Sequence, residues 1–224
     1  MHDAIRRRVL MLAASGALGA SGLSGFMSRA LASGDLPKAS GIHRLEGTAT
    51  VNGTAARVGT PVQPGDRIET GRASQAVVVI GKDAFLVREM TVIETRGSDN
   101  GLKELLISTG RVLSVFAKKP VSIKVPVANI GIRGTGAYLE VEPQSVYFCL
   151  CYGEAVVEGA GMPAKVVKTT HHEQPMVIHA EGGATTADPA KFRNHTDDEL
   201  ILLESLVGRE PPFMKDGRYP ANRY

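Results

Sequence analysis

The stretch AVVVIGKDAFLVREMTVIE, residues 76–94, has the pattern of apolar residues and turns that predicts the fold class. Its apolar residues are mostly β-branched or aromatic, and GKD at 81–83 interrupts them with residues that suit a turn. Similar runs flank it in TATVNGTAARV (48–58), ELLISTGRVLSVF (104–116) and VSIKVPVANIGIRGTGAYLEVE (121–142). Short strands separated by turn residues predict a mainly β fold, either a β-sandwich or a short solenoid-like module.

Two short motifs predict tight turns within this pattern. Asn52-Gly53 indicates a β-hairpin, because Asn and Gly tolerate the positive φ of a primed turn. Pro64 and Gly65, followed by Asp66, place a fixed φ next to a flexible one, as a β-turn requires. We therefore expect these five residues to be structural.

The first 32 residues predict an export signal. Arg6, Arg7 and Arg8 precede an uncharged run of small and apolar residues at 9–27, and Ala-Leu-Ala at 30–32 offers a cleavage site. The arginines with the following Val-Leu also resemble the twin-arginine signal. An ordinary secretory signal and an uncleaved anchor stay open as alternatives. We expect the protein in the periplasm or secreted, with membrane contact only if the signal stays uncleaved.

Charge excludes one class of partner. Residues 1–32 hold four of the 26 Lys and Arg and one of the 23 Asp and Glu, so the remainder carries 22 of each sign. No polybasic stretch remains to neutralise phosphates, which excludes nucleic acid as the expected partner. The chain has two cysteines, so we expect its stability not to depend on a disulfide framework.

The character of the chain changes after residue 159, and we predict a C-terminal extension over 160–224. It holds two short strands, VVKTT and PMVIH, then a loop and a helix at about 197–207. Thr196 followed by Glu199 forms a capping box, and Gly208 suits the helix end. One face of the helix is apolar and is expected to dock on the β-module: Leu200, Leu203, Leu206 and Val207.

From Gly41 to Val157 the chain resembles the FecR domain. The motifs that carry the resemblance are Val51-Asn52-Gly53, Pro64-Gly65-Asp66, Thr70-Gly71, Ser74, Pro126 and the run Gly131-Ile132-Arg133-Gly134-Thr135. The resemblance implies a FecR-like β domain over 33–159 in an exported bacterial protein that binds or senses, with an unidentified protein or cell-envelope partner. Eight residues precede the apolar run, so we do not expect the cytoplasmic anti-sigma part of the FecR transducers.

Within the last of these motifs, Gly131 and Gly134 flank Arg133 where a strand is expected to bend. We expect the Arg133 guanidinium inside the fold, on carbonyls or on a carboxylate such as Asp66 or Glu140. A contact with a partner is the alternative.

YFCLCYGE, residues 147–154, places both cysteines one residue apart. We expect a strand from Val146 to Cys151, a turn at Tyr152-Gly153 and a return to Val157. Residues i and i+2 of a strand share a face with Cα atoms about 6.5–7 Å apart, which strains a Cys149–Cys151 disulfide. A metal site suits the geometry better, and two reduced thiols or a strained disulfide stay open.

Histidines follow the cysteines at 171, 172, 179 and 195. Neighbouring residues of a strand point to opposite faces, so one of His171 and His172 is expected to meet the sulfurs. His195 and Glu173 are further candidates for the fourth ligand. Such a site would take zinc or copper.

Two functions follow from the sequence. The first is a non-enzymatic FecR-like binding or sensing module, since catalytic motifs such as Gly-x-Ser-x-Gly and His-Glu-x-x-His are absent. The alternative is a metal-binding or thiol redox protein that uses Cys149 and Cys151 with His171 or His172.

Overall fold

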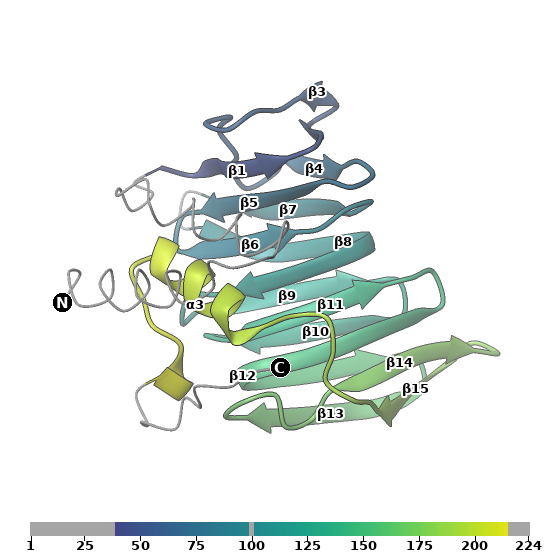
Figure 1. Ribbon diagram of the computed structural model, residues 1–224. Helices are drawn as coiled ribbons and strands as arrows, with labels where there is room; N and C mark the ends of the chain where they lie inside the picture. The colour runs from purple at the N-terminus through teal and green to yellow at the C-terminus, as the bar shows by residue number, and fades with distance from the viewer. Residues whose placement is uncertain (1–38, 99–100, 215–224) are drawn as a thin grey trace, which may run out of the picture.

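Strands and one docked helix make up the part of the chain that the computed structural model describes, residues 39–98 and 101–214 (Figure 1). The predicted mainly β module with a single α-helix is confirmed. The expected signal peptide, 1–32, lies outside the described residues. Within them, no helix is long and apolar enough to cross a membrane.

The strands form two sheets that share two long members, β8 and β12. We call sheet A the antiparallel series β1 (Gly41–Glu46), β5 (Gln75–Ile80), β6 (Asp83–Val87), β8 (Gly101–Val115), β11 (Gly136–Val141), β12 (Ser145–Gly159), β14 (Met176–Glu181) and β15 (Ala184–Pro189). We call sheet B the series β3 (Thr54–Ala55), β2 (Ala49–Val51), β4 (Arg67–Thr70), β7 (Val92–Ser98), β8, β9 (Pro120–Val125), β10 (Ala128–Arg133), β12 and β13 (Met162–Thr169). The β8–β9 pair is parallel, and the other pairs are antiparallel.

Both shared strands pass from one sheet to the other at a glycine with positive φ. In β8 this is Gly110, with φ 98°, and in β12 it is Gly153, with φ 101°. A Cβ on Gly153 would lie 2.7 Å from Cγ2 of Thr135, so only glycine fits there. The predicted turn at Tyr152-Gly153 is therefore wrong. β12 continues to Gly159, because a glycine at positive φ bends a strand as readily as it closes a hairpin.

Apolar side chains fill two separate layers. The larger cluster lies between the sheets and includes Phe148 of β12, and a second cluster covers the outer face of sheet A. In β5, Val78 belongs to the first cluster and Val79 to the second. Both faces of the central strands of sheet A are thus buried, which explains their continuous apolar runs.

The C-terminal segment forms the third layer, over the outer face of sheet A. Helix α3 (Asp197–Leu206) contacts β6 and β8, and Figure 1 shows it lying in front of these strands. Its capping box between Thr196 and Glu199 is formed as predicted, and its leucines are buried. A short 3₁₀ helix, η1 (Pro212–Met214), follows.

The extension over 160–224 differs from the prediction in one element. The two predicted strands are present as β13 and β14 and continue both sheets. The stretch expected to be a loop holds a third strand, β15, which forms a hairpin with β14. GATTADP lacks a clear apolar alternation, so its strand comes from pairing with β14.

The predicted turn residues behave as expected. Asn52 and Gly53 both have positive φ and join β2 to β3, and Gly65 lies in a turn with φ 112°. The carboxylate of Asp66 accepts hydrogen bonds from Nδ2 of Asn52 at 2.7 Å and from the backbone of Gln63 at 2.8 Å. These residues therefore form one structural unit at the N-terminal end of sheet B.

The expectation for Arg133 is wrong, because this side chain is exposed at the end of β10. Asp66 and Glu140, its expected partners, are held by other residues. Gly131 lies within β10 and does not have a positive φ, whereas Gly134 has a φ of 64°. Thr135, the last residue of the motif, is fully buried.

Candidate metal centre

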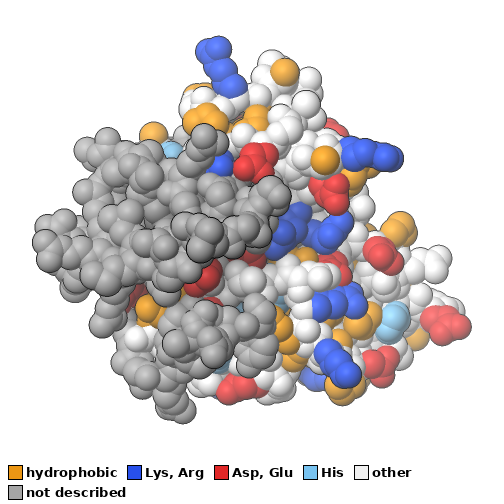
Figure 2. Space-filling view, in the orientation of Figure 1, with side chains coloured by type: hydrophobic (Ala, Val, Ile, Leu, Met, Phe, Trp, Pro, Cys, Tyr) orange, Lys and Arg blue, Asp and Glu red, His pale blue; other side chains and the backbone are white. Residues whose placement is uncertain are grey.

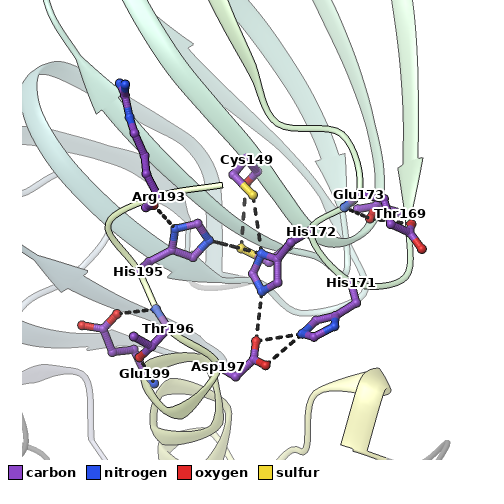
Figure 3. Close-up of polar contacts among 11 residues, drawn as sticks. Cys149, Thr169, His171, His172, Glu173, Arg193, His195, Thr196, Asp197 and Glu199 are labelled. Atoms are coloured by element: carbon purple, nitrogen blue, oxygen red, sulfur yellow. Dashed lines mark hydrogen bonds and ion pairs between the residues drawn. The ribbon is translucent and has the colours of Figure 1, made fainter. Parts of the chain in front are cut away.

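Three segments far apart in the sequence bring two thiols and two imidazoles together on the outer face of sheet A. Cys149 and Cys151 come from β12, His172 from the turn between β13 and β14, and His195 from the chain just before α3 (Figure 3). All four side chains are buried. One ligand atom of each lies within 4.8 Å of those of the others.

Three of the distances between these atoms match edges of a tetrahedron around one metal ion. Sγ of Cys149 lies 3.5 Å from Nδ1 of His172, and Sγ of Cys151 lies 3.5 Å from Nε2 of His195. The two ring nitrogens are 3.3 Å apart. Zinc bonds of about 2.3 Å to sulfur and 2.0–2.1 Å to nitrogen give tetrahedral edges of about 3.5–3.6 Å for sulfur to nitrogen and about 3.3–3.4 Å for nitrogen to nitrogen.

The other nitrogen of each ring already donates a hydrogen bond to an oxygen that can only be an acceptor. Nδ1 of His195 donates to the carbonyl of Arg193 at 2.8 Å, and Nε2 of His172 donates to Oδ1 of Asp197 at 3.0 Å. In the neutral imidazoles, the lone pairs of His172 Nδ1 and His195 Nε2 therefore converge on the thiols. This is the outer-shell arrangement that metal-bound histidines use.

Asp197, the first residue of α3, joins the centre to a third imidazole. Both of its oxygens lie 2.9 Å from Nε2 of His171, and one also accepts from His172. Burial raises the pKa of Asp197, but the hydrogen bonds from His172 and His171 outweigh it, so the pKa is lowered. The carboxylate is thus ionised beside the two rings and stabilises positive charge there.

The two thiols differ in their protonation. The hydrogen bond from Cys151 lowers the pKa of Cys149 to about 3, with His172 and His195 adding to the effect and burial opposing it. Burial raises the pKa of Cys151 well above its ordinary value, and the Cys149 thiolate adds to this. Burial lowers the pKa of His172, but hydrogen bonds to Asp197 and Cys149 outweigh it and raise the value. The centre therefore contains one thiolate, the form of cysteine that binds metals.

The backbone holds His172 in an unusual conformation. Its φ is 55°, which a residue with a Cβ rarely adopts, and its N–H donates to the carbonyl of Cys151 at 3.0 Å. This turn makes neighbouring residues face the same region, so both His171 and His172 point toward Asp197 (Figure 3). Strained backbone of this kind clusters at functional sites.

Aromatic rings enclose the imidazoles. His195 is stacked on Tyr138 with ring centroids 4.4 Å apart, and Phe192 lies 4.5 Å from both His195 and His172. Tyr147 lies on the cysteine face of β12, as expected, and is almost fully buried. These rings keep solvent from the four polar groups.

The structure places the predicted ligands as follows. Cys149, Cys151 and His172 come together, and His195, a candidate for the fourth ligand, completes the set. His171 does not join these four and instead contacts Asp197. The carboxylate of Glu173 accepts hydrogen bonds from Thr169 and Thr170, and His179 is exposed on β14.

Asp197 is the functional residue that the sequence analysis missed. An acidic residue directly after a helix N-cap is common, because the helix dipole stabilises negative charge there. The position of Asp197 is therefore explained without a second role. Its position two residues after His195 is the signal that points to the centre. The bond that makes Asp197 an outer-shell partner is to His172, 25 residues earlier in the sequence, so the spacing to His195 marks only its neighbourhood.

The fold and the site together define a mainly β module with a cluster of two cysteines and two histidines under its C-terminal segment. No family model and no curated protein matches the chain. Two crystal structures of a candidate anti-sigma factor from Parabacteroides distasonis ATCC 8503, at 1.65 and 2.50 Å, are similar to it, with a TM-score of 0.46 and identities of 10% and 11%. Each match covers 56% of this chain and 60% of the other, which is less than two thirds of either.

Proposed function

We propose that this protein is an exported, non-enzymatic β-module that binds one zinc ion between sheet A and its C-terminal segment. The ligands are Cys149, Cys151, His172 and His195. One observation carries the proposal: four donor atoms from three separate segments lie within 4.8 Å of one another, and three of the distances between them equal edge lengths of a zinc-centred tetrahedron.

The donor set favours zinc over copper. Two thiolates and two imidazoles in a tetrahedral arrangement suit zinc, whereas blue-copper sites use one thiolate, two imidazoles and a long axial ligand. Four protein ligands also leave no open position for a substrate or water. The site is therefore of the structural kind.

The ion would act as a clamp on the C-terminal layer. His195 directly precedes α3, so its bond to the metal fixes the start of the helix over β12. A site that assembles three segments exists only in the folded chain, and its binding free energy therefore adds to the free energy of folding. Without the ion, one thiolate, one thiol and two imidazoles share a single buried space.

Burial supports the non-enzymatic assignment. Cys149, His172 and Asp197 lie in the order of a thiol nucleophile, a base and an orienting carboxylate. Both cysteines are 0% exposed, so a substrate does not reach either sulfur. The same contacts suit a structural metal site, which does not need access for a substrate.

We place this metal module in the periplasm or outside the cell, because residues 1–32 have the features of an export signal. The FecR resemblance over Gly41 to Val157 supports a role in binding or sensing, with a cell-envelope protein as partner. The metal ligands lie at the end of that region and beyond it, in the extension that α3 closes.

Elemental analysis of protein purified without chelators tests the proposal. We expect about one zinc per chain that survives dialysis, and its loss in Cys149→Ser and His195→Gln. His179→Gln is the matched control, because His179 is exposed on β14 and lies outside the cluster. Metal-free protein with two thiols that titrate after unfolding would contradict the proposal, and one copper in place of zinc would reassign the ion.

A further inference from the structure

A pocket of about 550 Å³ lies beside the metal centre, between sheet A and the chain that leads into α3. Figure 2 shows Lys and Arg side chains gathered near the middle of the face that carries this layer. The residues that give the pocket its chemistry are Arg88, Arg111, Phe192, Arg193, His195 and Glu199. Its volume is in the range of pockets that bind small molecules.

The three arginines retain donors for a ligand. Nη2 of Arg88 donates to Asn194 and Glu199, Nη2 of Arg111 to Glu89, and Nη2 of Arg193 to Glu140. Each guanidinium has five N–H donors, so most of them are not used by these contacts. Nε of Arg88 is buried and has no hydrogen-bond partner among the described residues.

Fixed positions make these guanidinium groups suitable for recognition. The Arg193 guanidinium lies 4.3 Å from the centroid of the Tyr147 ring, which holds its plane. The Arg88 side chain is 17% exposed and is paired with the almost fully buried Glu199. Arg88 and Arg193 both line the pocket, and their contacts with Glu199, Glu140 and the Tyr147 ring reduce the conformational freedom that they would lose on binding.

The acidic groups nearby are already engaged. Glu199 bonds to Arg88 and to the backbone of Thr196, and Glu140 accepts from Arg193, Asn194 and Tyr138. Each of the three arginines is paired with one glutamate, Arg88 with Glu199, Arg111 with Glu89 and Arg193 with Glu140, so their charges are largely balanced. A pocket that offers guanidinium donors with balanced charge suits a monoanion better than a multiply charged ligand.

We infer that this pocket binds a small organic monocarboxylate. The planar guanidinium fork matches a carboxylate in two parallel hydrogen bonds, and the Phe192 ring in the wall accepts an apolar body. The inference goes beyond the proposed metal site, with which the pocket shares His195, and it rests on the arginines and Phe192 rather than on a bound metal.

Calorimetric titration of the full exported chain with benzoate tests the inference, with inorganic phosphate as the competing probe. We expect saturable 1:1 binding of benzoate that is weakened about tenfold or more in Arg111→Gln and in Arg193→Gln. Arg96→Gln is the control, because Arg96 is an exposed, ion-paired arginine on β7, away from the pocket. Circular dichroism and thermal unfolding establish that each variant is folded.

Three results would overturn the inference: no saturable benzoate binding, equal binding in wild type and both pocket variants, or tighter binding of phosphate than of benzoate. Zinc content is measured on the same samples. Benzoate binding by a chain that lacks zinc would contradict only the metal proposal. Zinc binding without benzoate binding would contradict only the pocket inference.

Discussion

Asp197→Asn separates the proposed metal role of this carboxylate from its role at the helix start. Asp197 accepts from His172 at 3.0 Å and from His171 at 2.9 Å, and its side chain is 3% exposed. Removal of an outer-shell carboxylate typically lowers metal affinity about 10–100-fold, which is about 1.4–2.8 kcal/mol. We expect a loss in this range, because Asn keeps the shape but not the charge that orients His172.

Asp198→Asn is the matched control, since it removes the same charge from the same helical turn and lies outside the ligand cluster. Each substitution costs about 0.3–1 kcal/mol through the helix dipole. Zinc affinity is measured by competition with a chromophoric chelator, and metal-free stability by urea unfolding. Equal zinc affinity in the two variants, within twofold, would refute the assignment of Asp197 to the metal site.

Three further predictions concern protons, the bend of β12 and the docked helix. Because the pKa of Cys149 is lowered and that of Cys151 is raised, zinc binding should release one proton from the thiol pair at a pH above the raised pKa of His172, and a second from His172 below it. Zinc affinity should therefore fall as pH falls. Calorimetry in buffers of different ionisation enthalpy counts the protons, and two released above the pKa of His172 would disagree. Gly153→Ala should destabilise the fold by about 1–3 kcal/mol in urea unfolding, because φ is 101° and the new Cβ meets Thr135, whereas Gly131→Ala should be near neutral. Leu203→Ala should cost about 2–5 kcal/mol, since the side chain is fully buried between α3 and sheet A, and a cost below 1 kcal/mol would argue against that docking.

Local signals were sufficient to predict the class of the fold. The Asn52-Gly53 turn and the Thr196–Glu199 capping box depend on residues within a few positions of each other, and both are formed. Gly153 shows the limit of such signals. Its positive φ is chemically the same in a hairpin and in a bent strand, and the choice depends on packing against Thr135 and pairing with β13.

The metal centre was predictable in part for the same reason. Strand alternation places Cys149 and Cys151 on one face, which the structure bears out. Alternation also predicted that His171 and His172 diverge, but the left-handed backbone of His172 turns both toward Asp197. That conformation is imposed by the turn and by the bond to Cys151, neither of which has a local sequence signal.

X-ray absorption at the metal edge of the purified protein tests the central claim most directly, because it reports the ligand atoms themselves. We expect zinc with two sulfur neighbours at about 2.3 Å and two imidazole nitrogens at about 2.0–2.1 Å. His195→Gln should remove one imidazole from that shell or empty the site. A shell of oxygen and nitrogen without sulfur, or protein without a metal edge, would contradict a centre built on Cys149 and Cys151.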